Sequence, residues 1–414
     1  MKYSIKNEII LQGRRDNQAW FEPRMTVIPH KGKKPEVFVI VTFLTGSDIG
    51  PDFFLKTTDL GSTWTPPALP RQWQKILTDE AALKKRIRKP PILINGEALE
   101  SLSHIYEYPK LGPLYHKKTN RLIALGHTQF SQDSGKNLLY KDEHHVSGLS
   151  TSPAFSIWNA ALQDFTPWQR IEVPEKLVSP WKIGFYCAGQ SHECRDGTII
   201  MPCICAMENS PLRVGSVKCK FDGKCIAISG FGKPVGTDVN GGVHEPSLVE
   251  LGGRYLMTIR SESKDFKMYH AVSEDGLNWE GFGPWCWDDG TPVETENTQQ
   301  HWLKHDKALY LIYTRKSKFS NGVFRSRAPL WIAEVDVETL RLIRKSERIV
   351  FPEKRARTCN FCVAGVTSDE AWVISGERLE GKFAGVRKGM RFYLEGGAIN
   401  YNQYIGDLLL ARII

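Results

Sequence analysis

Four side chains suited to acid–base chemistry stand where apolar runs of the sequence begin or end. They are Asp48, His127, Glu245 and His301. A carboxylic acid can protonate a leaving oxygen, and a carboxylate or an imidazole can take a proton from water or from carbon. We therefore predict these four as catalytic residues.

Further polar side chains take the same kind of position, and several of them are arginines. An arginine in a concave site binds a carboxylate through two parallel hydrogen bonds, so the set predicts a ligand that carries a carboxylate. The predicted binding residues are Arg24, Arg260, Gln300, Arg315, Arg325, Arg327, Asn360 and Glu377.

One unit recurs along the chain: an apolar run, a polar turn and a second apolar run. The clearest copy is Pro246–Leu251, the turn Gly252-Gly253, and Arg254–Ile259. Six hairpins spaced by about 60 residues predict an all-β propeller of six four-stranded blades. The six predicted hairpins span residues 25–43, 113–125, 193–205, 246–259, 302–313 and 361–374.

The two ends of the chain are predicted to close this ring. The apolar strands Ile9–Leu11 and Leu408–Ala411 can pair within one blade, which removes open sheet edges. The whole chain, 1–414, is then a single propeller domain. Residues 66–108 are too many for a blade connection and predict a short helical insertion between blades 1 and 2. If this stretch holds a further blade, the ring has seven.

The propeller explains why the polar positions belong together. In an antiparallel hairpin the start of the first strand lies beside the end of the second. The innermost strands of all blades run the same way, so these positions meet at one mouth of the central channel. The expected neighbours are Arg24 with Asp48, Tyr108 with His127, Gln190 or His192 with Glu208, Glu245 with Arg260, Gln300 or His301 with Arg315, and Asn360 with Glu377.

Two turns match the Asp-box pattern S/T-x-D-x-G-x-T-W. Thr57–Trp64 fits it fully, Ser273–Trp279 is one residue short, and Lys220–Gly223 is a degenerate third copy. In this pattern the Asp carboxylate caps the turn, Gly takes a positive φ and Trp packs back onto the blade. The turns are structural and carry no catalytic role.

With these turns the chain resembles the sialidase (neuraminidase) superfamily over most of its length. The resemblance implies that Arg24 is the first arginine of a carboxylate-binding triad and that Glu377 supports it. It also implies roles for Asp48 as acid/base, Glu245 as general base, Arg260 as second arginine, and Arg325 or Arg327 as third. The slot of the family's nucleophilic Tyr holds Asn360, which departs from the family pattern.

Three functions follow from this resemblance and from the rim residues. The first is an exo-acting glycoside hydrolase that cleaves at a sialic or uronic acid. The second is a polysaccharide lyase in which His127 or His301 removes a proton beside a uronate carboxylate, and the third is a propeller that binds glycans without cleaving them. Asp48, Glu245 and Arg260 together favour cleavage of a glycosidic bond.

Composition limits the partners. The chain has 55 basic and 46 acidic residues, a net charge of +9 that suits an acidic oligosaccharide, and no nucleic-acid motif accompanies it. No apolar run indicates a signal peptide or a membrane span, so the chain as written is expected in the cytoplasm, or outside it if a leader was removed. The nine cysteines are expected mainly as free thiols. No cofactor or metal is predicted.

Overall fold

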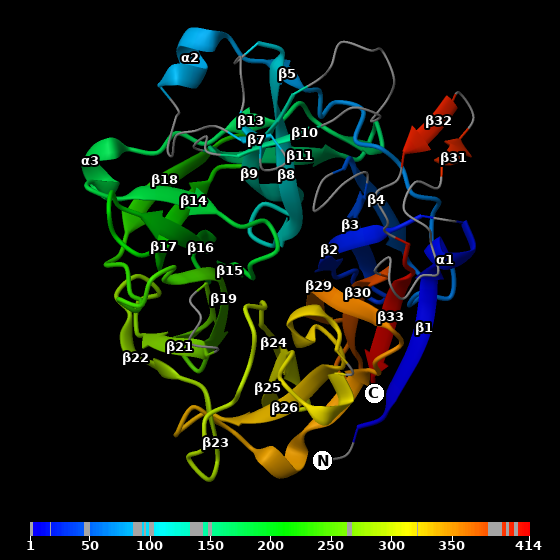
Figure 1. The fold of residues 1–414 in the computed structure, drawn as a ribbon, viewed down its shortest axis with the longest axis vertical. Helices are drawn as coiled ribbons and strands as arrows, with labels where there is room; N and C mark the ends of the chain where they lie inside the picture. Colours follow the sequence, from blue (N-terminus) through cyan, green and yellow to red (C-terminus); the bar gives the residue numbers. More distant parts are fainter. Residues whose placement is uncertain are drawn as a thin grey trace.

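In the computed structural model the chain forms a ring of small antiparallel sheets around a central channel (Figure 1). The structure describes residues 3–16, 18–44, 50–85, 93–94, 97–98, 103–132, 144–147, 151–262, 267–320, 322–379, 391–394, 397–400 and 405–414. None of the helices in these ranges is long and apolar enough to cross a membrane. The ring has six blades, so the predicted all-β propeller is confirmed with six blades rather than seven.

Each blade begins with a strand that lines the channel. These inner strands are β2 (Trp20–Ile28), β8 (Ile105–His116), β14 (Lys182–Phe185) with β15 (His192–Glu193), β19 (Val243–Leu251), β24 (His301–His305) and β29 (Ala356–Gly365). A second strand returns beside each of them: β3 (Glu36–Phe43), β9 (Arg121–Gln132), β16 (Thr198–Ala206), β20 (Arg254–Ser261), β25 (Ala308–Tyr313) and β30 (Ala371–Leu379).

The outer parts of the blades are more varied. The third strands are β4 (Asp52–Thr57), β11 (Pro153–Asn159), β17 (Arg213–Phe221), β21 (Met268–Ser273), β26 (Leu330–Asp336) and β33 (Leu408–Ile413). The outermost strands are β12 (Asp164–Phe165), β13 (Gln169–Arg170), β18 (Ile226–Phe231), β22 (Glu280–Pro284), β27 (Arg341–Leu342), β28 (Arg348–Phe351) and β1 (Ile5–Leu11).

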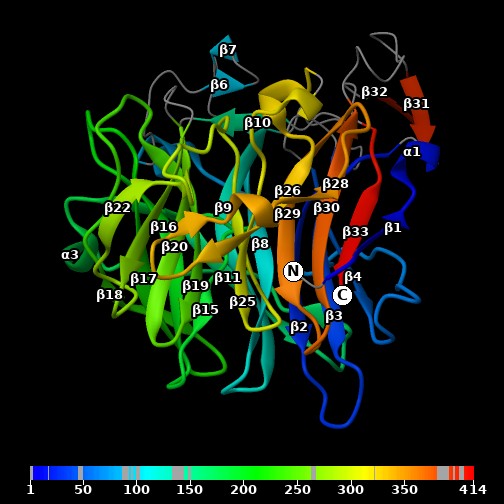
Figure 2. The ribbon, with the colours of Figure 1, turned by 90° about the horizontal axis from the view of Figure 1, so that it is seen from below.

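Short elements decorate the connections. They are α1 (Gly13–Asp16), β5 (Ile76–Leu77), α2 (Glu80–Lys84), β6 (Leu93–Ile94), β7 (Glu97–Ala98), β10 (His144–Ser147), α3 (Glu175–Val178), β23 (Cys286–Trp287), η1 (Lys318–Ser320), η2 (Phe324–Ser326), η3 (Arg344–Ser346), β31 (Arg391–Leu394) and β32 (Gly397–Asn400). Figure 2 shows β6, β7, α1 and β31 at one end of the propeller, opposite the long hairpin turns.

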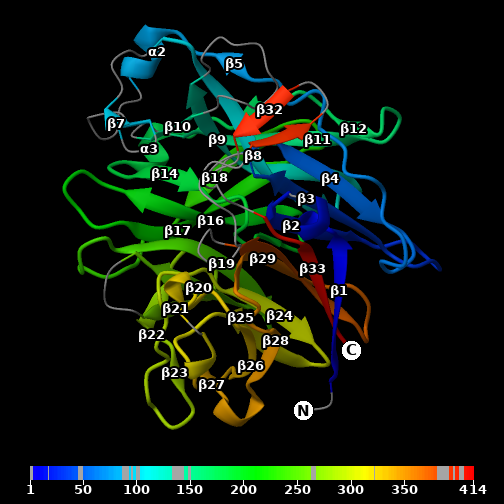
Figure 3. The ribbon, with the colours of Figure 1, turned by 45° about the vertical axis from the view of Figure 1, so that its right-hand side comes forward.

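The ring closes through its two ends, as the sequence indicates. Strands β1 and β33 pair antiparallel from Ile5↔Ile413 to Leu11↔Leu408, and both belong to the blade of β29 and β30 (Figure 3). Apolar side chains of adjacent blades pack into continuous clusters between the sheets, for example Val39 with Trp372 and Leu410. Blade-to-blade packing therefore holds the channel-lining strands in place.

The turns with the Asp-box pattern are capped by their aspartates. Asp59 accepts hydrogen bonds from the amide of Thr63 at 3.0 Å and from its hydroxyl at 2.7 Å, and Gly61 takes a φ of 75°. Asp275 accepts from the amide of Asn278 at 2.7 Å in the same way. Both turns lie after the third strand of their blade, away from the channel.

Candidate active site

Three inner strands carry the same irregularity where they enter the mouth of the channel. In β2, β19 and β29 one extra residue interrupts the pairing with the second strand, which makes a β-bulge. The bulges hold Glu22, Glu245 and Asn360, whose φ values are 50°, 44° and 51°. A bulge re-aims a side chain, and here three blades each present one polar side chain at the mouth.

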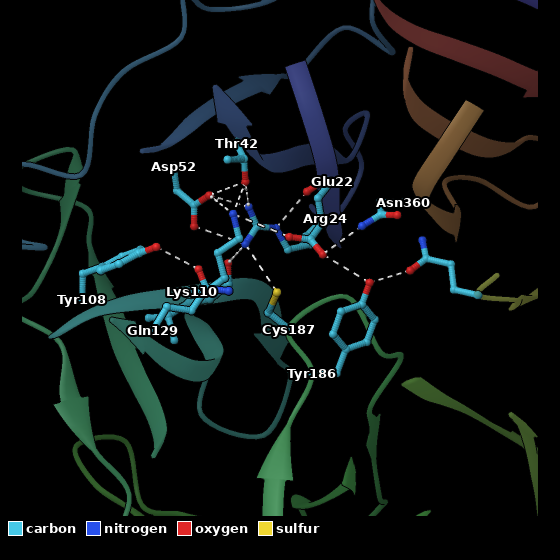
Figure 4. Close-up of polar contacts among 12 residues, drawn as sticks. Glu22, Arg24, Thr42, Asp52, Tyr108, Lys110, Gln129, Tyr186, Cys187 and Asn360 are labelled. Carbon is cyan, nitrogen blue, oxygen red and sulfur yellow. Dashed lines mark hydrogen bonds and ion pairs between the residues drawn. The ribbon is translucent and has the colours of Figure 1, made fainter. Parts of the chain in front are cut away.

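Glu22 lies at the centre of the polar cluster in Figure 4. Its Oε1 accepts hydrogen bonds from the hydroxyl of Tyr186 at 3.2 Å and from Nδ2 of Asn360 at 3.3 Å. Its other oxygen lies 3.5 Å from Nζ of Lys110. Glu22 is only 7% exposed, so these partners define its environment.

Tyr186 follows β14 and projects into this cluster from the third blade. The same hydroxyl lies 2.5 Å from Oε1 of Gln299, and its single proton is donated either to Glu22 or to Gln299. Gln299 is oriented by its own bond to the carbonyl of Phe361 at 3.2 Å. Burial and the nearby charges of Glu245 and Glu22 raise the pKa of Tyr186 well above its usual range. The phenol therefore keeps its proton at neutral pH. It can lose that proton only to a base that touches its hydroxyl, and Glu22 is such a base.

A buried ion cluster lies beneath this pair. The guanidinium of Arg24 binds both carboxylate oxygens of Asp52, at 2.6 and 3.2 Å, and Lys110 reaches the same carboxylate at 3.1 Å. Burial alone would raise the pKa of Asp52, but the two cations and the hydrogen bond from Thr42 lower it to about 2. Asp52 is therefore a permanent anion that holds the two cations.

Glu245 forms a second charged group on the opposite side of the mouth. Its carboxylate lies 2.5 Å from Arg260, whose other nitrogens contact Glu262 at 2.7 Å and Asn297 at 2.6 Å. Burial would raise the pKa of Glu245, but Arg260 and His244 outweigh it and hold the pKa well below its usual range. Glu245 is thus an anion fixed in place and 11% exposed to the mouth.

The channel continues below the mouth as a cavity of about 170 Å³. Tyr186, Cys187 and His301 contribute to its wall. All eight cysteines whose side chains are described are free thiols. Within the described ranges, no three His, Cys, Asp or Glu side chains are arranged to hold a metal ion.

The same architecture occurs in solved structures. A protein of unknown function from Dyadobacter fermentans superimposes with a TM-score of 0.57 and 13% identity over 98% of both chains. The NanB sialidase of Streptococcus pneumoniae gives 0.57 with 12% identity, over 95% of this chain and 68% of that one. The Hadza microbial sialidase Hz136 gives 0.56 with 10% identity, over 90% and 66%. The fold is that of the sialidases.

At these identities the likeness concerns the fold alone. No family model and no curated protein matches the chain. The sialidase-like propeller spans about two thirds of the length of the two sialidases.

The sialidase-like propeller brings several predicted residues together and separates others. Arg24, His127, Glu245, Arg260 and Asn360 lie around the mouth, and His301 and Gln300 lie buried just below it. Arg315 instead pairs with Glu347 at 2.5 Å and packs on Trp331. Arg327 is buried with no hydrogen-bond partner for Nε in the described part of the chain, and Arg325 is half-buried in η2. Asp48 lies outside the described residues.

Two expected pairings are wrong. Glu377 does not support Arg24 but binds Arg14 of α1 at 2.7 and 2.8 Å, because α1 packs beside the end of β30. His192 is not at the mouth, since β15 pairs with the far end of β16, whereas β14 pairs with the mouth end. The inner strand of this blade is split, and the split places Tyr186 at the mouth.

Sequence reasoning missed Glu22 and Tyr186. A signal for Glu22 was present: Glu22-Pro23 and Glu245-Pro246 are the same dipeptide at the same place in two blades. Tyr186 had no comparable signal, because its position depends on where β14 ends.

The buried histidines predict a loss of stability in mild acid. Burial lowers the pKa of His301 from 6.5 to about 4. Between these two pH values the unfolded chain binds a proton at His301 and the folded chain does not. The contribution of His301 to the free energy of unfolding is fully present above pH 6.5 and falls as the pH drops toward 4. At pH 5 this group alone lowers the free energy of unfolding by about 2 kcal/mol. Urea unfolding at pH 7.5, 6 and 5 measures it. His301→Gln should reduce the slope with pH, and an unchanged slope would remove His301 as its source.

Proposed function

We propose that this protein is an exo-acting glycoside hydrolase that cleaves a glycosidic bond at a terminal acidic sugar, sialic or uronic. The observation that carries the proposal is the contact between the Tyr186 hydroxyl and the Glu22 carboxylate across the mouth, beside the fixed anion Glu245. A phenol in contact with a carboxylate base is an activated nucleophile. Asn360, in the slot that the resemblance assigns to the nucleophile, holds Glu22 instead.

The chemistry needs two steps. In the first step Tyr186 attacks the anomeric carbon while Glu22 accepts the tyrosine proton. The bond between the sugar and the leaving oxygen breaks as that oxygen takes a proton from an acid, and we propose Asp48 as this acid. Water then displaces the tyrosine from the sugar and gives its proton to the same acid/base residue, and the released tyrosine oxygen takes its own proton back from Glu22. Glu245 is an anion held by Arg260, and it would stabilise the positive charge that develops on the sugar ring.

The carboxylate of an acidic sugar needs a cation that is not already neutralised. Arg24, Arg260 and Arg315 each bind a carboxylate of the protein. We therefore assign the sugar carboxylate to Arg327, whose Nε has no hydrogen-bond partner among the described residues.

One observation favours a uronate lyase as a second candidate. Nδ1 of His127 is buried without a hydrogen-bond partner in the described ranges, and burial, Lys110 and Arg24 lower the pKa of the ring to about 3. A neutral imidazole has a free lone pair that can accept the proton next to a uronate carboxylate, and its lowered pKa makes it a weak base for that step.

The test is an activity panel of sialosides and uronic-acid-terminated oligosaccharides, monitored for new reducing ends and for the ultraviolet absorbance of unsaturated uronates. Reducing ends without that absorbance support the hydrolase, and reducing ends with it establish the lyase. Binding without cleavage would replace both with a glycan-binding propeller.

Glu245→Gln should lower kcat by about 10²-fold, because the charge that stabilises the transition state is lost. Glu347→Gln is the matched control, since Glu347 pairs with Arg315 at the same 2.5 Å but away from the mouth. Equal losses in the two variants would contradict a catalytic role for Glu245.

A further inference from the structure

A second hollow lies between the third and fourth blades, at the end of the propeller opposite the mouth. Its volume is about 1320 Å³, and we call it the basal groove. His192 of β15 and Lys218 of β17 line one wall, and both pair with Ile200 of β16, so their side chains point to the same side of the blade. Gly252 and Gly253, in the turn between β19 and β20, line the other wall. Figure 2 shows the hairpin turns of this end opposite α1 and β31.

Tyr255 of β20 joins the two walls of the basal groove. Its hydroxyl lies 3.3 Å from Sγ of Cys194, and its ring packs edge-on against His192 with the ring centres 5.6 Å apart. The turn Gly252-Gly253 has no side chains, and no described atom beyond the turn itself lies within 4 Å of where a Cβ would stand at either glycine. The contact of Tyr255 therefore fixes the two walls, and the space between them stays open.

The acidic side chains of the basal groove are bound by backbone amides. The carboxylates and the residues whose amides donate to them are Glu193 with Lys117 and Lys118 at 2.7 and 2.9 Å, Asp196 with Thr198 at 2.9 Å, and Glu250 with Gly253 at 2.7 Å. These bonds hold each carboxylate in place. A carboxylate can accept about four hydrogen bonds, so each of them keeps lone pairs for a further donor.

The basic side chains of the groove are not paired with these acids. Lys117, Arg195 and Lys218 line the groove, and none of them forms an ion pair with another described residue. Nζ of Lys118 binds only a carbonyl oxygen, that of Asp196 at 2.6 Å. The three unpaired cations come from the turn of the second blade, the turn of the third blade and β17, so they are spread over the groove. An anion with one charge would meet one of them, whereas a chain with repeated charges would meet several.

We propose that the basal groove binds an acidic polysaccharide, a chain that carries a carboxylate or sulfate on successive sugar units. Its acidic groups pair with Lys117, Arg195 and Lys218, and its hydroxyls donate to the fixed carboxylates of Glu193 and Glu250. Nucleic acid suits the groove less, because its phosphates follow one another at about 3.4 Å along each strand and would be repelled by those carboxylates. The inference goes beyond the proposed function and does not need cleavage at the mouth.

Removing the three unpaired cations tests the groove. The probe is polygalacturonate, and binding is measured by calorimetry at low ionic strength in the Tyr186→Phe background, so that the polymer is not consumed. The triple variant Lys117→Gln, Arg195→Gln, Lys218→Gln should bind it about tenfold more weakly, because each exposed ion pair is weak but three are lost together. The three side chains are exposed or half-buried, so the variant should unfold at the wild-type temperature.

A second basic turn supplies the matched control. Lys31, Lys33 and Lys34 are exposed in the turn between β2 and β3, at the same end of the propeller but in the first blade. Replacing all three by Gln removes the same charge and should leave the affinity for polygalacturonate within about twofold.

The outcomes separate this inference from the proposed function. Equal losses in the two triple variants would overturn the groove, because binding would then follow net charge alone. The groove is also overturned if polygalacturonate is not bound, or if a DNA oligonucleotide or phosphatidylserine vesicles bind more tightly through the same three residues. In the otherwise wild-type chain, the groove variant should cleave the best small substrate of the activity panel at the wild-type rate. If nothing in that panel is cleaved but the polymer binds through the groove, the hydrolase falls and the groove stands.

Discussion

Replacing Tyr186 by Phe is expected to lower kcat by about 10³-fold while the protein stays folded. The substitution removes only the hydroxyl that lies between Glu22 and Gln299, and the ring keeps its packing. KM should change little, because the oxygen is used in the reaction and not to hold the sugar. Steady-state kinetics on the best substrate of the activity panel measures this.

Tyr313 supplies the control. Its hydroxyl also donates to a carboxylate, that of Glu347 at 2.6 Å, but the pair lies in the fifth blade away from the mouth. Tyr313→Phe should therefore retain the rate. If Tyr186→Phe keeps more than about a tenth of the wild-type rate, Tyr186 is not the nucleophile and the lyase becomes the better candidate.

Neutralising Asp52 is expected to destabilise the fold by about 3–5 kcal/mol. Arg24, Asp52 and Lys110 are all at most 3% exposed in their side chains, so Asp52→Asn leaves two buried cations beside Glu22 alone. Urea unfolding at pH 7 measures the change. The wild-type protein should lose this stabilisation only in strong acid, because the lowered pKa keeps Asp52 ionised until the pH approaches 2.

A surface pair gives the comparison for this result. Asp289 contacts Arg344 at 3.0 Å with both side chains about half exposed, and Asp289→Asn should leave the unfolding curve unchanged because water screens the pair. A similarly small effect of Asp52→Asn would mean that the buried cluster is not an ion network.

The blades were predictable because they depend on local signals. Alternating apolar runs and polar turns such as Gly252-Gly253 fix where a hairpin begins and ends, and the strands β19 and β20 lie where these signals place them. The mouth was predictable for the same reason, since strand ends define it. Glu245 and Arg260 accordingly lie together at 2.5 Å.

The partners within the mouth could not be predicted. Whether Arg24 meets Asp52 or a ligand depends on side chains from other blades, and Glu377 meets Arg14 across 363 positions of sequence. The register is equally hidden, because one extra residue in a strand turns its side chains to the other face. Glu22 reaches the mouth only through such an extra residue.

The three bulges also have a thermodynamic consequence. A left-handed backbone suits Asn, but it costs a residue such as Glu about 1 kcal/mol, so Glu22 and Glu245 hold conformations that their own side chains disfavour. Asparagine at either place would relieve that strain and remove the acid. Selection for stability alone would therefore replace the acidic residues at these two positions of the mouth, while the blades that support them could stay unchanged.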